Sequence, residues 1–316
     1  MAMIIYSEPK TVSDLPIIDI GPSFSNNKAH RVEVAKKIGR ACKETGFFYI
    51  SNHGVDQYLI DETFVQANRF FDQSIEWKEK WKKKGGSNGY EPLETQRLDN
   101  ESPGDIKESF NFTLGNIPGT SGYKSNIWPK NFPEFRSQLE AYKTAVWKAG
   151  LQVSRLISLS LGMPFKHFDA TFSQQKSPLR ILCYPPQPKI TQYNQLGCGA
   201  HTDWGWITLL SQDMTGGLEV EKASGEWVRV EPIRGTFVVN LGDIMLRWTN
   251  AKYHSSLHRV MNNYSGINRH SIVLFFNHSH DTHVECLPSC LSSAEKPIFL
   301  PCTAGEHSAQ RYKESR

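Results

Sequence analysis

The sequence predicts a mainly β fold with flanking α-helices, in which an antiparallel sandwich or a closed jelly roll forms the core. After Leu179, short runs of β-branched and aromatic residues alternate with turns at nearly even spacing. Before Leu179, longer stretches place apolar residues at helical spacing. The 316 residues, 39% hydrophobic and 22% charged, are ordinary for a globular protein and are enough for a large core.

The N-terminal half is expected to supply helices and a few short strands. Apolar runs predict strands at 12–22 and 47–50. Helical spacing predicts amphipathic helices over 30–45, 57–83 and 134–162. Residues 84–130 are rich in Gly, Pro, Ser and Asn, so we expect an irregular segment there that acts as a lid or pocket entrance.

The C-terminal half is expected to supply the strands of the core. Six runs combine strand-forming residues with turn residues at their ends: 180–186, 206–213, 216–230, 235–243, 257–263 and 269–278. Helices therefore precede strands within one compact unit.

Composition also restricts the compartment and the partners. A net charge of +4 is too small to argue for a nucleic-acid partner. The N-terminus lacks the pattern of a signal peptide, and no apolar run approaches the roughly 18 residues of a membrane span. The six cysteines form no CxxC pair, which is typical of reduced thiols. We expect a cytoplasmic protein without a membrane partner, and the oligomeric state stays open.

Two metal-binding residue types stand just before one predicted strand. His201 and Asp203 are separated by a single residue, and alternate residues of a strand share a face, so both can hold one metal ion. His258 follows 55 residues after Asp203 and lies in another predicted strand. Two histidines and one carboxylate form the facial triad that binds ferrous iron and leaves positions open for substrate and oxygen.

A second pair of residues indicates a carboxylate-binding group. Arg269 and Ser271 share one face of a predicted strand by the same spacing rule. A guanidinium fork and a hydroxyl together match one carboxylate. Because an unpaired buried charge is costly, Arg269 requires either a bound carboxylate or a core Asp or Glu.

These residues occur within ordered motifs that resemble the isopenicillin N synthase-like family of Fe(II)/2-oxoglutarate-dependent dioxygenases. The triplet HTD at 201–203 is followed by LHRV at 257–260 and RHS at 269–271, in the family order. Further matching segments are LPIID at 15–19, GFFYISNHGV at 46–55, RILCYPP at 180–186, GGLEV at 216–220, GD at 242–243 and TN at 249–250.

The resemblance covers most of the chain and implies one catalytic unit over residues 1–316. The implied core is a distorted double-stranded β-helix, a cupin-like jelly roll, at 171–290. A mostly helical region at 1–170 would precede this core, and a C-terminal tail at 291–316 would follow it.

The resemblance also implies the cofactors and the reaction. Fe2+, 2-oxoglutarate as co-substrate and O2 would be used. The expected reaction is oxidation of an unactivated C–H bond of a small organic molecule of specialised metabolism, by hydroxylation, desaturation or oxidative cyclisation, with release of succinate and CO2. Iron would be bound by His201, Asp203 and His258, and 2-oxoglutarate by Arg269, Ser271 and Tyr184.

Some positions depart from the family pattern or stay ambiguous. Leu182 stands where many members carry Asn. Trp206 fits either the core or the pocket wall, and His278, with His280 and His283, fits either a solvated loop end or a substrate contact. We expect His307 at the surface. The candidate substrate residues are Tyr90, Phe110, Phe112, Trp206, Phe276 and His278.

Three other functions remain compatible with the sequence. An iron oxidase of the same fold could act without 2-oxoglutarate, with the Arg–Ser pair holding the substrate's own carboxylate. A non-catalytic jelly-roll protein could use the pocket for binding alone. A protein hydroxylase could use 84–130 as a peptide groove. Succinate formation and iron binding separate the first two alternatives from the main prediction.

Overall fold

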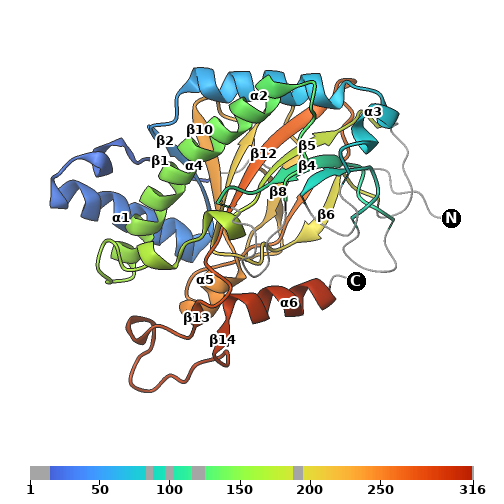
Figure 1. The fold of residues 1–316 in the computed structure, drawn as a ribbon. Coiled ribbons are helices and arrows are strands. Elements are labelled where there is room, and N and C mark those ends of the chain that lie inside the picture. The colour runs from blue at the N-terminus through green and yellow to red at the C-terminus, as the bar shows by residue number, and fades with distance from the viewer. Residues whose placement is uncertain (1–14, 83–87, 97–102, 116–124, 188–194, 315–316) are drawn as a thin grey trace.

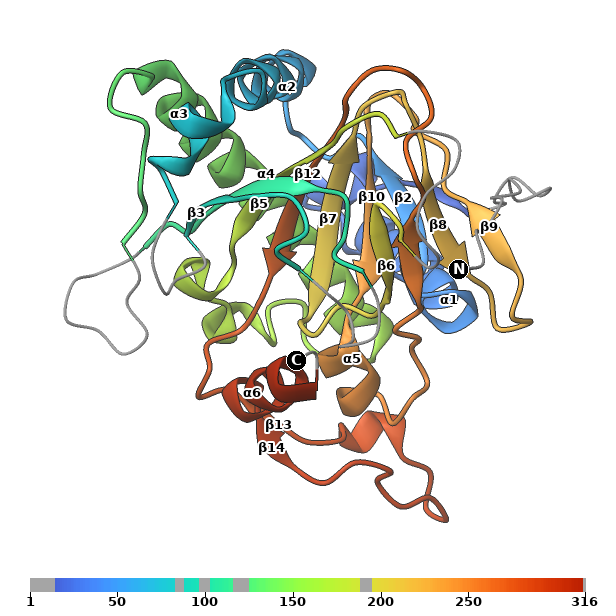
Figure 2. The same ribbon diagram turned by 90° about the vertical axis from the view of Figure 1, so that its right-hand side faces the viewer.

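The structure, a computed structural model, describes residues 15–82, 88–96, 103–115, 125–187 and 195–314. Its core consists of two β-sheets that face each other (Figure 1, Figure 2). The larger sheet has the order β1 (Ile17–Asp19), β2 (Phe47–Ser51), β10 (Thr236–Leu241), β7 (Ile207–Gln212), β12 (Arg269–Phe276), β5 (Leu179–Tyr184), β4 (Glu108–Phe112) and β3 (Gly89–Glu91). The smaller sheet has the order β6 (Cys198–His201), β11 (His258–Val260), β8 (Leu218–Glu221) and β9 (Trp227–Arg229).

The jelly-roll prediction is confirmed. Each of the six C-terminal runs contains at least one strand, and the strands from β10 to β3 in the larger sheet pair in antiparallel fashion. β1 instead runs parallel to β2 at the edge of the sheet. Apolar residues from both sheets, including Tyr49 and Val220, meet in one buried cluster between the sheets.

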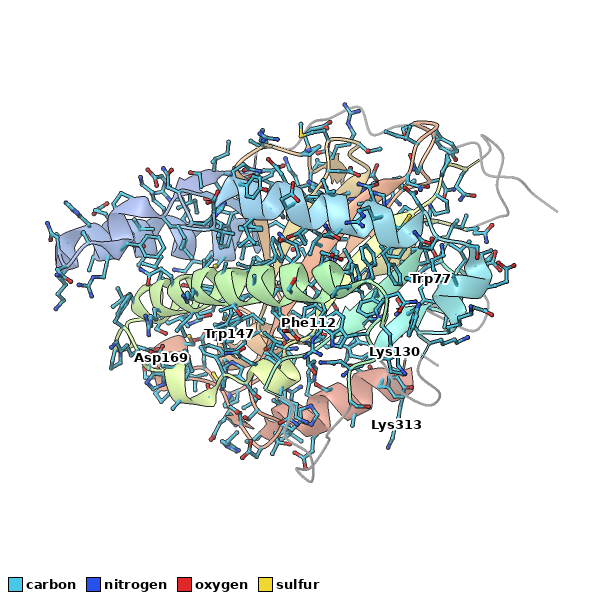
Figure 3. The ribbon with its side chains drawn as sticks, turned by 45° about the horizontal axis from the view of Figure 1, so that its top comes forward. Trp77, Phe112, Lys130, Trp147, Asp169 and Lys313 are labelled. Atoms are coloured by element: carbon cyan, nitrogen blue, oxygen red, sulfur yellow. The ribbon has the colours of Figure 1, made fainter. Side chains whose placement is uncertain are left out.

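Three helices cover the outer face of the larger sheet: α1 (Lys28–Glu44), α2 (Gln57–Phe71) and α4 (Pro133–Ser160). The predicted apolar stripe of α4, from Phe135 to Leu156, is buried against this face. Trp147 of α4 packs on Phe276 of β12, with ring centroids 4.3 Å apart, and Figure 3 shows its place on the helix. This packing fixes which residues of β12 face the helices and which face the cavity.

The structure corrects two expectations for the N-terminal half. The single helix expected over 57–83 is divided, because Ser74 accepts a hydrogen bond from the backbone N–H of Trp77 and begins a second helix, α3 (Ile75–Glu79). The segment 84–130 contains β3 and β4, which extend the larger sheet, so its described part is not an irregular lid.

The C-terminal elements gather at one end of the two sheets (Figure 2). They are α5 (Asp243–Trp248), α6 (Ala304–Glu314) and the two-stranded sheet of β13 (His283–Val284) and β14 (Cys302–Thr303). Short 3-10 helices occur at Gly21–Phe24, Asp169–Thr171, Gln174–Lys176 and Pro288–Cys290. Among the described residues, no helix combines the length and the apolar character needed to cross a membrane.

Candidate active site

Three predicted metal ligands come together between the sheets. His201 ends β6 and His258 begins β11, and the two residues are direct partners in the antiparallel pair. Their rings lie 4.3 Å apart, and the Nε2 atoms of His201 and His258 lie 3.9 Å and 3.8 Å from Oδ1 of Asp203. One ligand atom from each residue lies within 4.8 Å of the other two. Two imidazole nitrogens and one carboxylate oxygen are a donor set that suits iron(II).

Hydrogen bonds orient the carboxylate of Asp203. Its Oδ2 accepts from the hydroxyl of Thr208 on β7 and from Nδ2 of Asn240 on β10, the latter at 2.7 Å. These two donors leave Oδ1 directed at the histidines. Burial acts to raise the pKa of Asp203, but His258, His201 and the two donors together lower it below its usual value. The residue therefore presents a carboxylate near neutral pH.

The backbone fixes the orientation of both imidazoles. Nδ1 of His201 lies 2.9 Å from the carbonyl oxygen of Gly199, and Nδ1 of His258 lies 3.1 Å from that of Ser256. A proton on each Nδ1 satisfies these carbonyls and leaves the lone pair of each Nε2 for a metal. Burial and the neighbouring His201 lower the pKa of His258, so this imidazole is neutral near pH 7.

Arg269 is a buried cation at the same cavity. Only 1% of its surface is exposed, and its guanidinium lies over the ring of Tyr184, 4.7 Å from the centroid. Nε donates to the carbonyl of Gly216, and Nη2 donates to Oε1 of Gln212 at 3.2 Å. Nη1 is buried without a hydrogen-bond partner, and no carboxylate among the described residues forms an ion pair with Arg269. A carboxylate brought by a ligand would satisfy this group.

Ser271 and Tyr184 join Arg269 at this end of the cavity. Ser271 lies two residues after Arg269 on the same face of β12, and Tyr184 of β5 is the direct strand partner of Arg269. Leu182 also faces the cavity, so the position where many members carry Asn provides an apolar surface here.

The cavity extends beyond the metal ligands. Lys107, Arg180 and Phe275 line it, although the sequence analysis did not single them out. Lys107 donates to Oδ2 of Asp105 at 2.7 Å and to Sγ of Cys198 at 2.9 Å. Burial acts to lower the pKa of Lys107, but Cys198 and Asp105 together raise it, so Lys107 stays protonated and forms a buried ion pair with Asp105.

Five of the six predicted substrate residues belong to the core between the larger sheet and the helices. Tyr90, Phe110, Phe112, Trp206 and Phe276 are buried there and do not line the cavity. Phe110 packs on Phe135 of α4 at 5.1 Å, and Nε1 of Trp206 donates to Ser154 of α4 at 3.0 Å. The structure therefore places these five candidates away from the cavity of the metal ligands. Aromatic character does not tell which face of a strand points to the cavity.

His278, the sixth candidate, also lies away from the metal ligands. It is 3% exposed, and its ring packs among those of Trp206, Trp248 and Phe172, with centroid distances of 5.0, 4.7 and 4.5 Å. Nδ1 lies 2.6 Å from Oγ1 of Thr171. This burial is inconsistent with a solvated loop end, and His278 does not line the cavity of the metal ligands. His307 is likewise buried, 7% exposed, and not at the surface as expected.

Comparison with known proteins places this site in a family. Residues 15–131 match the family described as non-haem dioxygenase in morphine synthesis N-terminal, and residues 175–278 match the 2OG-Fe(II) oxygenase superfamily. The 2-oxoglutarate-Fe(II) type oxidoreductase hxnY of Emericella nidulans is 35% identical over 95% of this chain and 90% of its own. The chain is a 2-oxoglutarate- and iron(II)-dependent oxygenase.

Two further similarities support the assignment of the chain to this family. The homoarginine-6-hydroxylase 2-ODD-C23 of Glycine max is 34% identical over 93% of this chain and 95% of its own. The crystal structure of a full-length Neurospora crassa protein in complex with alpha-KG superposes with a TM-score of 0.86, at 26% identity, covering 98% of this chain and all of that one. The oxygenase uses Fe2+, 2-oxoglutarate and O2, and His201, Asp203 and His258 form its metal-binding group.

Thr208 and Asn240, which orient the metal ligand Asp203, were not found from the sequence. Asn240 stands two residues before the GD motif, and Thr208 follows Asp203 by five residues. A polar residue at an inward-facing position of an apolar strand was the available signal for both. Lys107 precedes β4 and lies outside any strand, so strand alternation gave no such signal for it.

Proposed function

We propose that this oxygenase oxidises a C–H bond of a small organic molecule and converts 2-oxoglutarate to succinate and CO2. The observation that carries the proposal is the pairing of two features in one cavity. The three metal ligands lie together in the cavity. Arg269, which is buried and forms no ion pair with a carboxylate of the described residues, lies at the end of the same cavity. A dicarboxylate that bridges a metal ion and a cation fits this arrangement.

In this proposal Arg269, Ser271 and Tyr184 bind the distal carboxylate of 2-oxoglutarate. Nη1 of Arg269 donates one hydrogen bond, and the hydroxyls of Ser271 and Tyr184 are placed to donate others. The contacts of Arg269 with Gly216 and Gln212 keep the guanidinium fixed before the ligand arrives. Selection for a dicarboxylate of this length then follows from the fixed separation between Arg269 and the metal ligands.

The metal-binding group would hold iron(II) through Nε2 of His201, Nε2 of His258 and Oδ1 of Asp203. Bound iron(II) supplies the activation of O2 and the oxidative decarboxylation of the co-substrate. Thr208 and Asn240 keep the second oxygen of Asp203 engaged, so that the carboxylate does not turn away from the metal.

The substrate would occupy the part of the cavity lined by Arg180, Leu182 and Phe275. These residues follow the inward faces of β5 and β12 away from Arg269. A mixed wall of one cation and apolar side chains suits a small organic molecule with a polar group. The relatives support this size: one is a homoarginine-6-hydroxylase, and the Neurospora crassa protein was also crystallised with alpha-KG and thymine. The mass of the product separates hydroxylation, which adds one oxygen, from desaturation and ring closure, which both remove two hydrogens.

The experiment is a screen of small-molecule pools with the purified protein, Fe2+ and 2-oxoglutarate. Succinate formed in step with a substrate mass change of one added oxygen or two lost hydrogens is the expected result. Substrate oxidation without succinate would contradict the use of 2-oxoglutarate. Arg269→Ala should weaken 2-oxoglutarate binding by about 30-fold or more, measured by calorimetry with Mn2+ in place of iron, because truncating one partner of a buried charged pair costs about 2–5 kcal/mol.

The matched control is Arg234→Ala. Arg234 forms an exposed ion pair with Asp61, 2.7 Å from Nη2 to Oδ2, and it does not line the cavity. Its removal should leave the affinity for 2-oxoglutarate unchanged. Equal affinity in Arg269→Ala and Arg234→Ala would show that the buried arginine is not the carboxylate-binding group.

A further inference from the structure

The C-terminal helix α6 reaches the segment that carries two of the metal ligands. Nη2 of Arg311 donates to Oγ1 of Thr202 at 3.2 Å, and Thr202 lies between His201 and Asp203 in the sequence. Nε of the same guanidinium lies 3.1 Å from Oδ2 of Asp243, the first residue of α5. One side chain near the end of the chain therefore contacts the ligand segment and the start of α5.

Asp243 is in turn connected to both ligand segments. Its backbone N–H donates to the carbonyl oxygen of Asp203 at 2.7 Å. Its Oδ1 accepts from the hydroxyl of Ser255 at 2.8 Å. Ser255 is followed by Ser256, whose carbonyl oxygen lies 3.1 Å from Nδ1 of His258. The position of Asp243 thus affects the backbone of Asp203 and the residue that orients the imidazole of His258.

The carboxylate of Asp243 is buried, with 9% of the residue exposed, so it requires a partner of opposite charge. Two basic side chains of α6 lie beside it. Arg311 is the closer one, and Nε2 of His307 lies 3.8 Å from Oδ2. Figure 3 shows Lys313, two residues after Arg311, projecting away from the sheets. Near the end of α6, Lys313 therefore points away from the sheets, whereas Arg311 contacts Asp243 and Thr202.

We propose that Arg311 is a positioning residue of the metal centre. By holding Asp243 and Thr202, it fixes the backbone on which Asp203 and His201 stand and, through Ser255, the segment before His258. α6 then serves to lower the cost of ordering the three ligands when the metal binds. This role rests on the metal site on which the proposed function depends, and it adds a determinant that lies more than 50 residues from any ligand in the sequence.

The test is a Co2+ titration of the full chain, followed through the visible absorption of the bound ion, in Arg311→Gln and Arg234→Gln. Changes around metal ligands commonly cost about 10- to 100-fold in metal affinity. We expect that loss in Arg311→Gln and none in Arg234→Gln, whose arginine lies in a surface ion pair with Asp61. Arg311→Lys, which keeps the charge beside Asp243, should recover part of the affinity.

Two further measurements separate positioning from a general loss of stability. Metal-free Arg311→Lys, which keeps a charge beside the buried carboxylate of Asp243, should unfold at a temperature similar to that of Arg234→Gln, so its remaining loss of Co2+ affinity cannot come from a loss of stability. Thr202→Val, which removes the acceptor but keeps the ion pair with Asp243, should weaken Co2+ binding less than Arg311→Gln. Wild-type affinity in Arg311→Gln would overturn the positioning role alone. Absence of metal binding by the wild-type chain would overturn the proposed function as well.

Discussion

Two hydrogen bonds to Oδ2 of Asp203 fix the orientation of this carboxylate before a metal binds. Thr208→Val removes one of its two donors while keeping the shape of the side chain. We expect metal affinity to fall by about tenfold, because the carboxylate gains rotational freedom. Co2+ titration measures this. Thr236→Val on β10 is the control, since its hydroxyl serves only the carbonyl of Ile233. Wild-type affinity in Thr208→Val would contradict the orienting role.

At the scale of residues, the sequence predicted ligands better than it predicted their supports. His201, Asp203 and His258 were found because residue type and spacing alone define a metal-binding set. Asn240 could not be found in the same way. Its contact with Asp203 depends on β10 lying beside β7, and the order of strands in a sheet is a property of the whole fold.

At the scale of elements, adjacent residues of β12 have opposite roles. Phe276 is fully buried against α4, packed on Trp147 and Phe172, whereas Phe275 lines the cavity. Phe276→Ala should lower the free energy of unfolding by about 3–5 kcal/mol, because it leaves a void in the core. Phe275→Ala should cost less stability and raise KM for the organic substrate. Urea unfolding and steady-state kinetics of both variants measure this.

The pair Phe275 and Phe276 also shows which part of the fold was predictable. Alternation and β-branched runs identified the C-terminal strands, and the periodicity of α4 identified its buried stripe. Alternation from Arg269 and Ser271 also predicts that Phe275 shares their face of β12, although both faces of this strand are largely buried. The candidate Phe276 lies one position out of phase with that face. Equal losses of unfolding free energy in Phe275→Ala and Phe276→Ala would contradict the opposite roles of these two residues.

At the scale of the whole molecule, burial of neutral histidines makes the fold sensitive to acid. Burial is the first cause that lowers the pKa of His53, His258, His270, His278 and His307. The count of 11 histidines was visible in the sequence, but their burial was not. His278 is the clearest example. It is buried among aromatic rings, including those of Trp206 and Trp248, which lie far from it in the sequence, and this burial lowers its pKa to about 3.

The sign of this effect follows from proton binding in the two states. An unfolded imidazole has a pKa of about 6.5, so between about pH 6.5 and 3 the unfolded chain binds a proton at residue 278 that the folded protein does not. The stability associated with neutral His278 is therefore fully present above about pH 6.5 and falls as the pH falls. The slope from one such group is at most about 1.4 kcal/mol per pH unit.

We therefore expect the metal-free protein to lose stability steadily from pH 7 to pH 4, and His278→Asn to reduce the slope of that loss by about 1 kcal/mol per pH unit. Asparagine can keep a hydrogen bond to Thr171 but carries no titrating group. Urea unfolding with a chelator present, repeated across this pH range, measures the slope. His283→Asn is the matched control, because His283 is exposed and pairs only with Glu285 at 3.2 Å. Identical slopes in His278→Asn and the wild type would show that the buried imidazole is already protonated in the folded protein.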